Sequence, residues 1–156
     1  MPVRMLKEFL DQKKVKYVAI KHSPAFTAQE IAASAHIAGQ ELAKTVMVKL
    51  DGEMAMAVLP ASFLVDFDLL KGATGAKKAE LASEEEFEKL FPGCELGAMP
   101  PFGNLYDMKV YVAHRLSEDE EISFNAGTHT ELVKLAYADF ANLVKPKLIT
   151  MTGVYV

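Results

Sequence analysis

The dipeptide Asp51-Gly52 constrains the fold of this chain more than any other feature, because it joins two strand-like stretches through only two residues. Aspartate followed by glycine favours the tight turn with positive φ at both positions that connects antiparallel strands. Apolar residues dominate both flanks, which are residues 43–50 before the turn and residues 54–59 after it. The sequence therefore predicts an antiparallel hairpin that belongs to a larger sheet.

Helical spacing recurs on both sides of this hairpin. An opening helix carries Leu6, Phe9 and Leu10 on one stripe and ends near Lys13 and Lys14. Four further helices are predicted: one after the capping box at residues 27–30, one over residues 63–70 that stops at Gly72, one capped by Ser83 with Phe87 and Leu90 facing inward, and one over residues 139–144.

Strand spacing predicts further strands at residues 17–22, 109–114, 121–125 and 131–135. We expect the second and third of these to pair with each other across the acidic turn between them. The combined pattern predicts an α/β fold of the α+β type. Its sheet should be mixed and largely antiparallel, flanked by helices, and different from a doubly wound parallel sheet.

Composition limits the class of protein. A chain of 156 residues with 51% hydrophobic residues is expected to form one domain over residues 1–156. Its apolar runs are shorter than the roughly 18 residues that span a bilayer, and the N-terminus does not resemble a signal peptide, so we expect a cytoplasmic protein without a membrane partner. The single cysteine, Cys94, excludes an internal disulfide and fits a reducing compartment.

The charge is unevenly distributed along the chain. The net charge is -4, but residues 80–95 and 118–121 together contain ten acidic residues and one lysine, so these two segments carry -9 and the remainder carries +5. A local basic surface is therefore compatible with an acidic protein, although lysines spread over a solvated surface are the ordinary explanation.

Lys44 is the residue of greatest functional interest. Strand alternation places its amine on the same face as Val46, Val48 and Leu50, which is the expected core face, whereas Thr45 and Lys49 point to the other side. Burial in such a position would lower the pKa of the amine. The alternative is a lysine at the mouth of the strand that extends its amine to water.

Motif searches remove several reaction classes. The sequence contains no Gly-x-Ser-x-Gly elbow, no His-Glu-x-x-His, no phosphate-binding loop and no dinucleotide fingerprint. The four histidines, at positions 22, 36, 114 and 129, lack the spacing of metal ligands, so neither a metal nor another cofactor is predicted.

Residues 97–103 read Gly-Ala-Met-Pro-Pro-Phe-Gly and indicate a rigid loop. Pro100 and Pro101 have fixed φ and no N–H, so any main-chain donors must come from the other five residues. Such amides can be aimed at a negatively charged oxygen without reorganisation. The alternative is a stiff connector between a helix and a strand.

These features occur together in an order that resembles the family of YbaK and the editing domain of prolyl-tRNA synthetase, which are aminoacyl-tRNA deacylases. The similarity covers nearly the whole chain. It rests on four segments: residues 17–24 leading to residues 27–30, residues 42–45, residues 97–103 and residues 125–130. The resemblance implies a partly barrel-like sheet flanked by helices. It also implies hydrolysis of the ester that joins a wrong amino acid to the terminal ribose of a tRNA, which requires no serine or cysteine nucleophile.

The resemblance also implies roles for individual residues. The lysine that matches Lys44 would hold the terminal phosphate or ribose, and the main chain of Gly97, Ala98 and Gly103 would contact the reacting centre. Ala98 stands where serine or threonine is frequent in the family, so a hydroxyl is lost here while the amide is retained. The predicted substrate-binding residues are His22, Thr45, Met99, Pro100, Pro101, Phe102, Gly127 and His129.

The resemblance implies a deacylase that acts in trans on the acceptor end of a tRNA carrying a small amino acid. Alanine on tRNA for proline is favoured, with cysteine or another small residue as the alternative. A synthetase is a second candidate partner. Two other functions remain open: a non-catalytic module that binds tRNA or a synthetase, and a hydrolase of small esters or amides unrelated to tRNA.

Overall fold

The computed structural model describes residues 2–21, 42–95 and 98–152, and these form a mixed sheet with helices on both faces. The strands are β1 (Tyr17–Lys21), β2 (Leu42–Leu50), β3 (Glu53–Pro60), β4 (Ala79–Leu81), β5 (Lys109–Ala113), β6 (Glu121–Asn125), β7 (Glu131–Ala136) and β8 (Lys147–Ile149). The helices are α1 (Pro2–Gln12), α3 (Phe67–Thr74), α4 (Glu84–Phe87) and α5 (Tyr137–Val144), with 3-10 turns η1 (Glu88–Leu90), η2 (Gly103–Leu105) and η3 (His114–Glu118).

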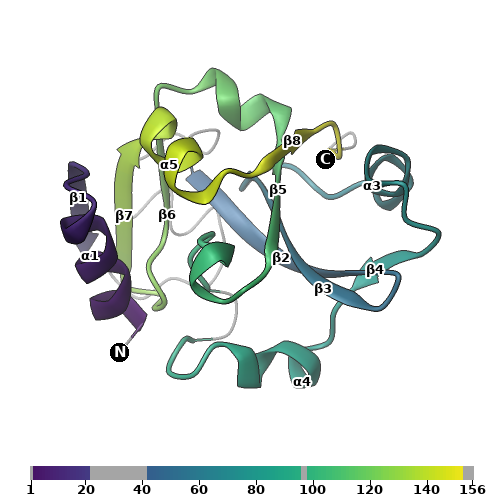
Figure 1. Cartoon of the computed structure of the whole chain (residues 1–156), viewed down its shortest axis with the longest axis horizontal. Helices are drawn as coiled ribbons and strands as arrows, with labels where there is room; N and C mark the ends of the chain where they lie inside the picture. The colour runs from purple at the N-terminus through teal and green to yellow at the C-terminus, as the bar shows by residue number, and fades with distance from the viewer. Residues whose placement is uncertain (1, 22–41, 96–97, 153–156) are drawn as a thin grey trace.

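The eight described strands follow the order β1-β7-β6-β2-β3-β5-β8, and β4 pairs with β2 (Figure 1). Within the described residues, four of the seven strand pairings are antiparallel, and three, β2 with β6, β3 with β5 and β5 with β8, are parallel. This arrangement confirms the predicted mixed sheet and excludes a doubly wound parallel one.

The hairpin of β2 and β3 forms as the sequence predicts. Asp51 and Gly52 have φ of 51° and 85°, and the pairing runs from Leu50 with Glu53 to Ala43 with Pro60. The Asp51 carboxylate also accepts hydrogen bonds from the amides of Lys77 and Lys78, which fixes the turn to the segment that leads into β4.

Three local predictions were wrong. Strands β5 and β6 do not pair with each other, because the residues between them form η3, whose Leu116 is fully buried. Helix α3 begins later than expected, after the cap Asp66, and continues through Gly72 to Gly75, whose φ of 77° ends it. Leu90 lies in η1 and is exposed, so only Phe87 faces inward.

Each face of the sheet has its own hydrophobic core. On one face, Leu6 and Leu10 of α1 and Phe140 of α5 pack against an aromatic group that includes Phe102 and Phe124. The helices α1 and α5 lie on the viewer's side in Figure 1. We call this the aromatic core.

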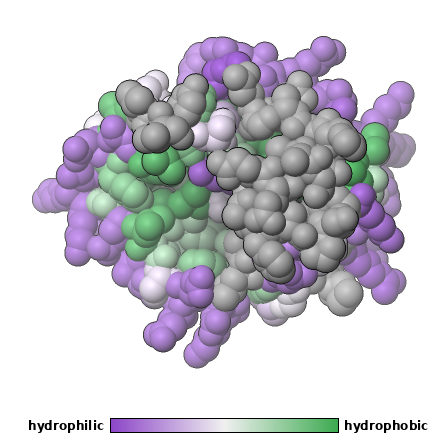
Figure 2. All heavy atoms as spheres, turned by 180° about the vertical axis from the view of Figure 1, so that it is seen from behind, coloured by the Kyte–Doolittle hydropathy of each residue, from purple (hydrophilic) through white to green (hydrophobic). Residues whose placement is uncertain are grey.

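The opposite face carries a smaller, aliphatic core. Val48, Ala57 and Leu59 of the hairpin pack there against Leu70 of α3 and against Met151 near the C-terminal end. Figure 2, which views the molecule from behind, shows hydrophobic residues gathered on one side of this surface and hydrophilic residues around them. Leu59, the pairing partner of Lys44, belongs to this second core. Strand β2 lies between the two cores, because Met47 belongs to the first and Val48 to the second.

Candidate active site

Lys44 lies near the start of β2, opposite Leu59 of β3. Its side chain is partly buried, in agreement with an amine that shares a face with Val46 and Val48. Burial lowers the pKa of the Lys44 amine from the ordinary lysine value of 10.5. The expected direction of the shift is confirmed, and the loss of hydration rather than a nearby charge causes it.

Strand β2 changes its partner on one side immediately after Lys44. It pairs with β6 only through Leu42 and Ala43, which lie opposite Ser123 and Phe124, and then pairs with β4 from Val48 onward. On the edge of β2 away from β3, residues 44–47 therefore lie between the segment that pairs with β6 and the segment that pairs with β4. On the same edge, the Ala82 amide donates to the Met47 carbonyl at 3.0 Å.

Asn125 is the polar residue that follows the β2–β6 pairing on β6, as Lys44 follows it on β2. The last pair of the two parallel strands is Ala43 with Phe124, so both side chains come directly after the point where the pairing ends. The Asn125 Oδ1 atom is buried and accepts no hydrogen bond within the described structure. A buried acceptor without a partner costs stability, so it requires a functional or structural reason.

The sequence analysis did not assign Asn125 to the site. The available signal was an amide at the end of an otherwise apolar strand, directly before the turn at residues 126–130. Its position at the end of the β2–β6 pairing depends on a parallel pairing of distant strands, which the local pattern does not contain.

The turn after β6 connects this strand end to the proline-containing loop. The Gly127 amide donates to the Ala98 carbonyl at 2.8 Å, and the Glu95 amide donates to the Gly127 carbonyl at 2.9 Å. Gly127 has a φ of 103°, a conformation that favours glycine. His129, in the same turn, is 7% exposed. The structure thus joins the predicted segments around Ala98 and Gly127, and the strand that precedes this turn, β6, pairs with β2 just before Lys44.

The loop itself is more deeply buried than a surface connector. Residues 98–103 are all buried, and Met99 and Phe102 belong to the aromatic core. The Phe102 ring is fully buried and packs against Phe124 and Phe140. Its predicted role in substrate binding stays a prediction.

Two further observations concern the predicted roles of Ala98 and Gly103. The Ala98 amide already donates to the Glu95 carbonyl at 3.0 Å, so it is not a free donor for an oxyanion. At Gly103, a Cβ atom would lie 2.5 Å from the Met108 carbonyl oxygen and 2.5 Å from Val110 Cγ2. Close packing, rather than approach to a substrate, therefore explains the glycine at this position.

The other predicted site residues have different outcomes. Thr45 is partly buried on β2, and Pro100 and Pro101 are buried in the loop. His22 and Gly97 lie outside the described residues. Among the residues that the structure describes, no group of three histidine, cysteine or acidic side chains could hold a metal ion.

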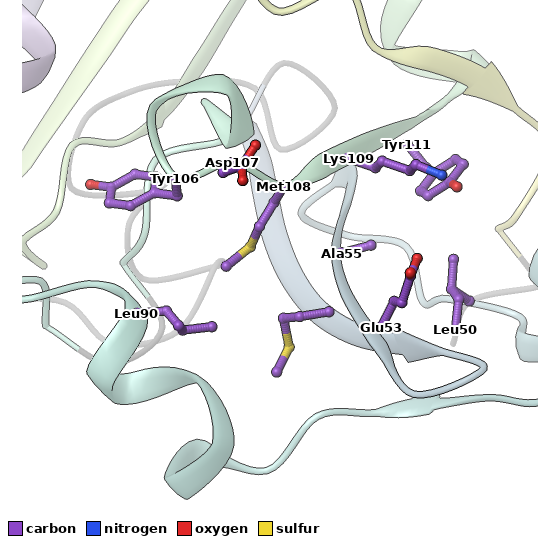
Figure 3. Close-up of a pocket in the computed structure, with 10 residues that line it drawn as sticks. Leu50, Glu53, Ala55, Leu90, Tyr106, Asp107, Met108, Lys109 and Tyr111 are labelled. Carbon is purple, nitrogen blue, oxygen red and sulfur yellow. The ribbon is translucent and has the colours of Figure 1, made fainter.

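Two cavities lie within the described regions, both near the beginning of β5. The larger, of about 430 Å³, has Glu53 on the hairpin side, Leu90 opposite, and Lys109 and Tyr111 at one end (Figure 3). Neither cavity is lined by Lys44, so these cavities are separate from the site around residues 44, 98 and 127.

Helices of the described regions include none that is long and apolar enough to cross a membrane.

Comparison with known proteins gives consistent results. Residues 22–143 match the aminoacyl-tRNA editing domain family. The chain is 29% identical over 145 residues to the multifunctional Ser/Thr-tRNA deacylase ProXp-y of Escherichia coli K12, with 90% of this chain and 86% of the relative covered. It is 27% identical over 106 residues to the proline–tRNA ligase of Bacillus mycoides, where 68% of this chain matches 18% of the ligase.

The fold is shared with a solved structure as well. The crystal structure of a candidate trans-editing enzyme for prolyl-tRNA synthetase superimposes with a TM-score of 0.83 at 17% identity, covering 98% of both chains. The predicted enzyme class, an aminoacyl-tRNA hydrolase, agrees with the family and with the deacylase relative. The chain belongs to the family of aminoacyl-tRNA editing domains.

Proposed function

We propose that this protein acts in trans on mischarged tRNA in the cytoplasm and hydrolyses the ester between a small amino acid and the terminal ribose. The observation that carries the proposal is the position of Lys44, a partly buried amine that directly follows the last β2–β6 pair, as Asn125 does on the strand that leads into the Gly127 turn. This turn is hydrogen-bonded to the proline-containing loop.

In the proposed reaction, water adds to the ester carbonyl carbon and the bond to the ribose oxygen breaks. The ribose oxygen receives a proton, which leaves a free amino acid and a tRNA with its terminal hydroxyl. The Lys44 ammonium holds the terminal phosphate or ribose, so that the ester is fixed before attack. The side-chain Oδ1 atom of Asn125 accepts a hydrogen bond from the substrate. The donor is the ammonium group of the amino acid or a ribose hydroxyl, and this bond satisfies the buried Oδ1 atom.

Negative charge on the former carbonyl oxygen requires donors. The Ala98 amide is used within the loop, so we assign this role to the amides of Met99 and Gly103, which donate to no other described main-chain group. His129, in the Gly127 turn, contributes to orienting the amino acid.

The amino acid is small in this proposal, and alanine on tRNA for proline is the first candidate. The relationship to a Ser/Thr-tRNA deacylase adds serine and threonine to the substrates to be tested, together with cysteine. One methylene group changes binding by only about 1 to 3 kcal/mol, so the pocket should accept several of these with graded rates.

The test is a deacylation assay with tRNAs charged with alanine, serine, threonine, cysteine or proline. Lys44→Met removes the charge and keeps the length of the side chain, and Lys77→Met is the matched control at an exposed lysine. We expect hydrolysis of at least one small amino acid by the parent and by the control, and a loss of about 100-fold or more in Lys44→Met with unchanged folding. Equal rates in the two variants would contradict the role of Lys44.

A second variant tests the role of Asn125. Asn125→Ala removes the unpaired acceptor, so the folded protein should be at least as stable as the parent, whereas deacylation should become slower by roughly tenfold. Thermal unfolding and single-turnover kinetics measure the two effects. A stability loss without a kinetic effect would show that Asn125 is structural.

A non-catalytic module is the second candidate, and the occupied Ala98 amide is the observation that favours it. In that case the parent binds uncharged tRNA but hydrolyses none of the charged tRNAs.

A further inference from the structure

Three lysines from three different elements line the smaller of the two cavities. Lys109 begins β5, Lys145 ends α5, and Lys147 begins β8. The cavity has a volume of about 270 Å³, and Asn104 and Tyr111 also line it. Lys147 lies opposite Tyr111 in the parallel pair of β5 and β8, which places Lys147 and Lys109 on the same face of the sheet. We call this set of three residues the lysine groove.

Within the described structure, no carboxylate neutralises these three lysines. Four lysines on β2, β7 and the α3–β4 region form ion pairs, namely Lys49, Lys71, Lys78 and Lys134. By contrast, no ion pair with a described carboxylate involves Lys109, Lys145 or Lys147, and no aspartate or glutamate lines their cavity. Glu53 and Asp107 line the adjacent, larger cavity together with Lys109, so acidic groups lie on one side of the groove only.

The end of α5 explains only one of the three charges. Lys145 has a φ of 52° and its amide donates to the Ala141 carbonyl, so it caps the helix at the end where the dipole favours a cation. Lys109 and Lys147 lie on strands and cap no helix. Like charges on neighbouring positions of one face repel each other, which an anionic partner would relieve.

The chemistry of the groove suits phosphate groups of a nucleic-acid backbone. Lysine is a compact point charge that positions phosphates without reading bases. The acidic helix α4 lies along the bottom of the molecule in Figure 1, whereas α5 and β8 lie near the top, so a polyanion would be directed to the groove side.

The register of the sheet places the groove at a suitable distance from Lys44. Lys44 pairs with Leu59 of β3, and Lys109 pairs with Ala55 of the same strand, four residues away. At about 3.3 Å per residue and about 4.8 Å per strand, the two Cα positions lie roughly 16 Å apart. This distance is shorter than an acceptor stem, so a tRNA whose end is at Lys44 can reach the groove with its stem.

We propose that the lysine groove binds phosphates of the acceptor stem of the tRNA substrate, away from the reacting ester. The identity of the RNA rests on the proposed function, but binding at the groove is independent of hydrolysis. The groove is therefore an affinity surface and contributes nothing to the chemical step.

The experiment compares Lys109→Gln/Lys147→Gln with Lys77→Gln/Lys89→Gln, which removes two unpaired exposed lysines elsewhere and changes the net charge equally. Binding of an uncharged tRNA transcript is measured over a series of salt concentrations. We expect the groove variant to bind the transcript about tenfold more weakly than the parent. The slope of the logarithm of the binding constant against the logarithm of the salt concentration should decrease in magnitude by roughly 0.7 to 0.9 for each lysine removed, while the control stays close to the parent. Adding Lys145→Asn, which suits the positive φ, should weaken binding further.

A short substrate separates this proposal from the proposed function. An aminoacyl ester of adenosine is too short to reach the groove, so the groove variants should hydrolyse it at the parent rate. Lys44→Met should hydrolyse it much more slowly than the parent. If Lys44→Met stays active but the groove variants lose tRNA binding, the proposed chemistry fails and the groove proposal stands. Equal tRNA binding by groove and control variants would overturn the groove proposal, as would binding of anionic lipid vesicles in preference to tRNA.

Discussion

At the scale of single residues, Lys44 has a partly buried side chain, and the pKa of its amine depends on its surroundings. Burial lowers its pKa, and a bound phosphate would raise it again. The amine is charged below this pKa and neutral above it. A reaction that needs the ammonium therefore decreases as the pH rises through the lowered pKa.

This behaviour predicts different pH profiles for the free and the bound enzyme. The decrease in kcat/KM, which reports the free enzyme, should begin below the ordinary lysine value of 10.5, and the decrease in kcat should begin at a higher pH than that in kcat/KM. NMR titration of the labelled amine, with and without uncharged tRNA, measures the same shift directly. A free-enzyme pKa at the ordinary lysine value of 10.5 would contradict the burial of Lys44.

Gly103 illustrates how a glycine near a site can serve packing. Gly103→Ala would force its Cβ against the Met108 carbonyl and the Val110 side chain, so we expect a loss of stability of roughly 1 to 3 kcal/mol. Urea unfolding measures this loss. A variant as stable as the parent would contradict close packing at Gly103, whereas reduced deacylation in such a variant would agree with the oxyanion role proposed for its amide.

At the scale of elements, helix α3 offers a matched pair of glycines. Neither Gly72 nor Gly75 has an atom within 4 Å of an added Cβ, but Gly75 has a φ of 77° and Gly72 is within the helix. Gly72→Ala should stabilise the protein by about 0.5 to 1 kcal/mol, and Gly75→Ala should destabilise it by a similar or larger amount. Denaturant midpoints decide between these signs. Equal effects would show that backbone conformation is not the cause.

Helix α4 is held by a capping box and by one ion pair. Ser83 and Glu86 cap each other's amides, and Lys49 of β2 lies 2.5 Å from Glu86. This contact lowers the pKa of the Glu86 carboxyl from 4.5 to about 2. Because the folded value is the lower one, the stabilisation is complete above the unfolded value and is lost as the pH falls toward 2.

Glu86→Gln tests this assignment. Its unfolding free energy should depend less on pH than that of the parent between about pH 5 and pH 2, while both proteins should show similar profiles above pH 6. Glu85→Gln, on the same short helix, serves as the control. An unchanged acid profile in Glu86→Gln would contradict the stabilising role of the contact with Lys49.

Local chemistry predicted some of these elements and not others. The Asp51-Gly52 turn and the Ser83 cap depend on adjacent residues, so the sequence contained their determinants. The end of α3 was misplaced because Gly72 is compatible with a helix and only the backbone conformation of Gly75 ends it. The pairing of β2 with β6 joins residues about 80 positions apart, and no local pattern specifies it. The partly buried position of Lys44 was therefore predicted from its own strand, whereas the position of Asn125 at the end of the β2–β6 pairing was not.

At the scale of the whole molecule, the C-terminal segment connects the two ends of the aliphatic core. Met151 is fully buried there, its carbonyl accepts a hydrogen bond from the Asp66 amide, and Thr152 forms a β-bridge with Val65. The segment thus joins the β8 edge of the sheet to the start of α3.

This arrangement predicts a strong effect of Met151→Ala. The cavity left behind should cost about 2 to 5 kcal/mol, whereas Leu148→Ala, at an exposed position three residues away, should stay within roughly 0.5 kcal/mol of the parent. Chemical unfolding followed by circular dichroism measures both. Similar values for the two variants would show that the segment detaches before the rest of the protein unfolds.

The change of partner along β2 has a consequence for how this protein can vary. On the edge of β2 away from β3, the peptide groups of residues 44–47 lie between the pairings with β6 and β4, and the Ala82 amide donates to the Met47 carbonyl there. Peptide groups are the same at every position, so Thr45 and Val46 can be replaced by other residues without changing the main-chain donors and acceptors that this edge of β2 presents to a ligand. Related proteins with different side chains at these positions can thus keep the same main-chain geometry at this edge of β2.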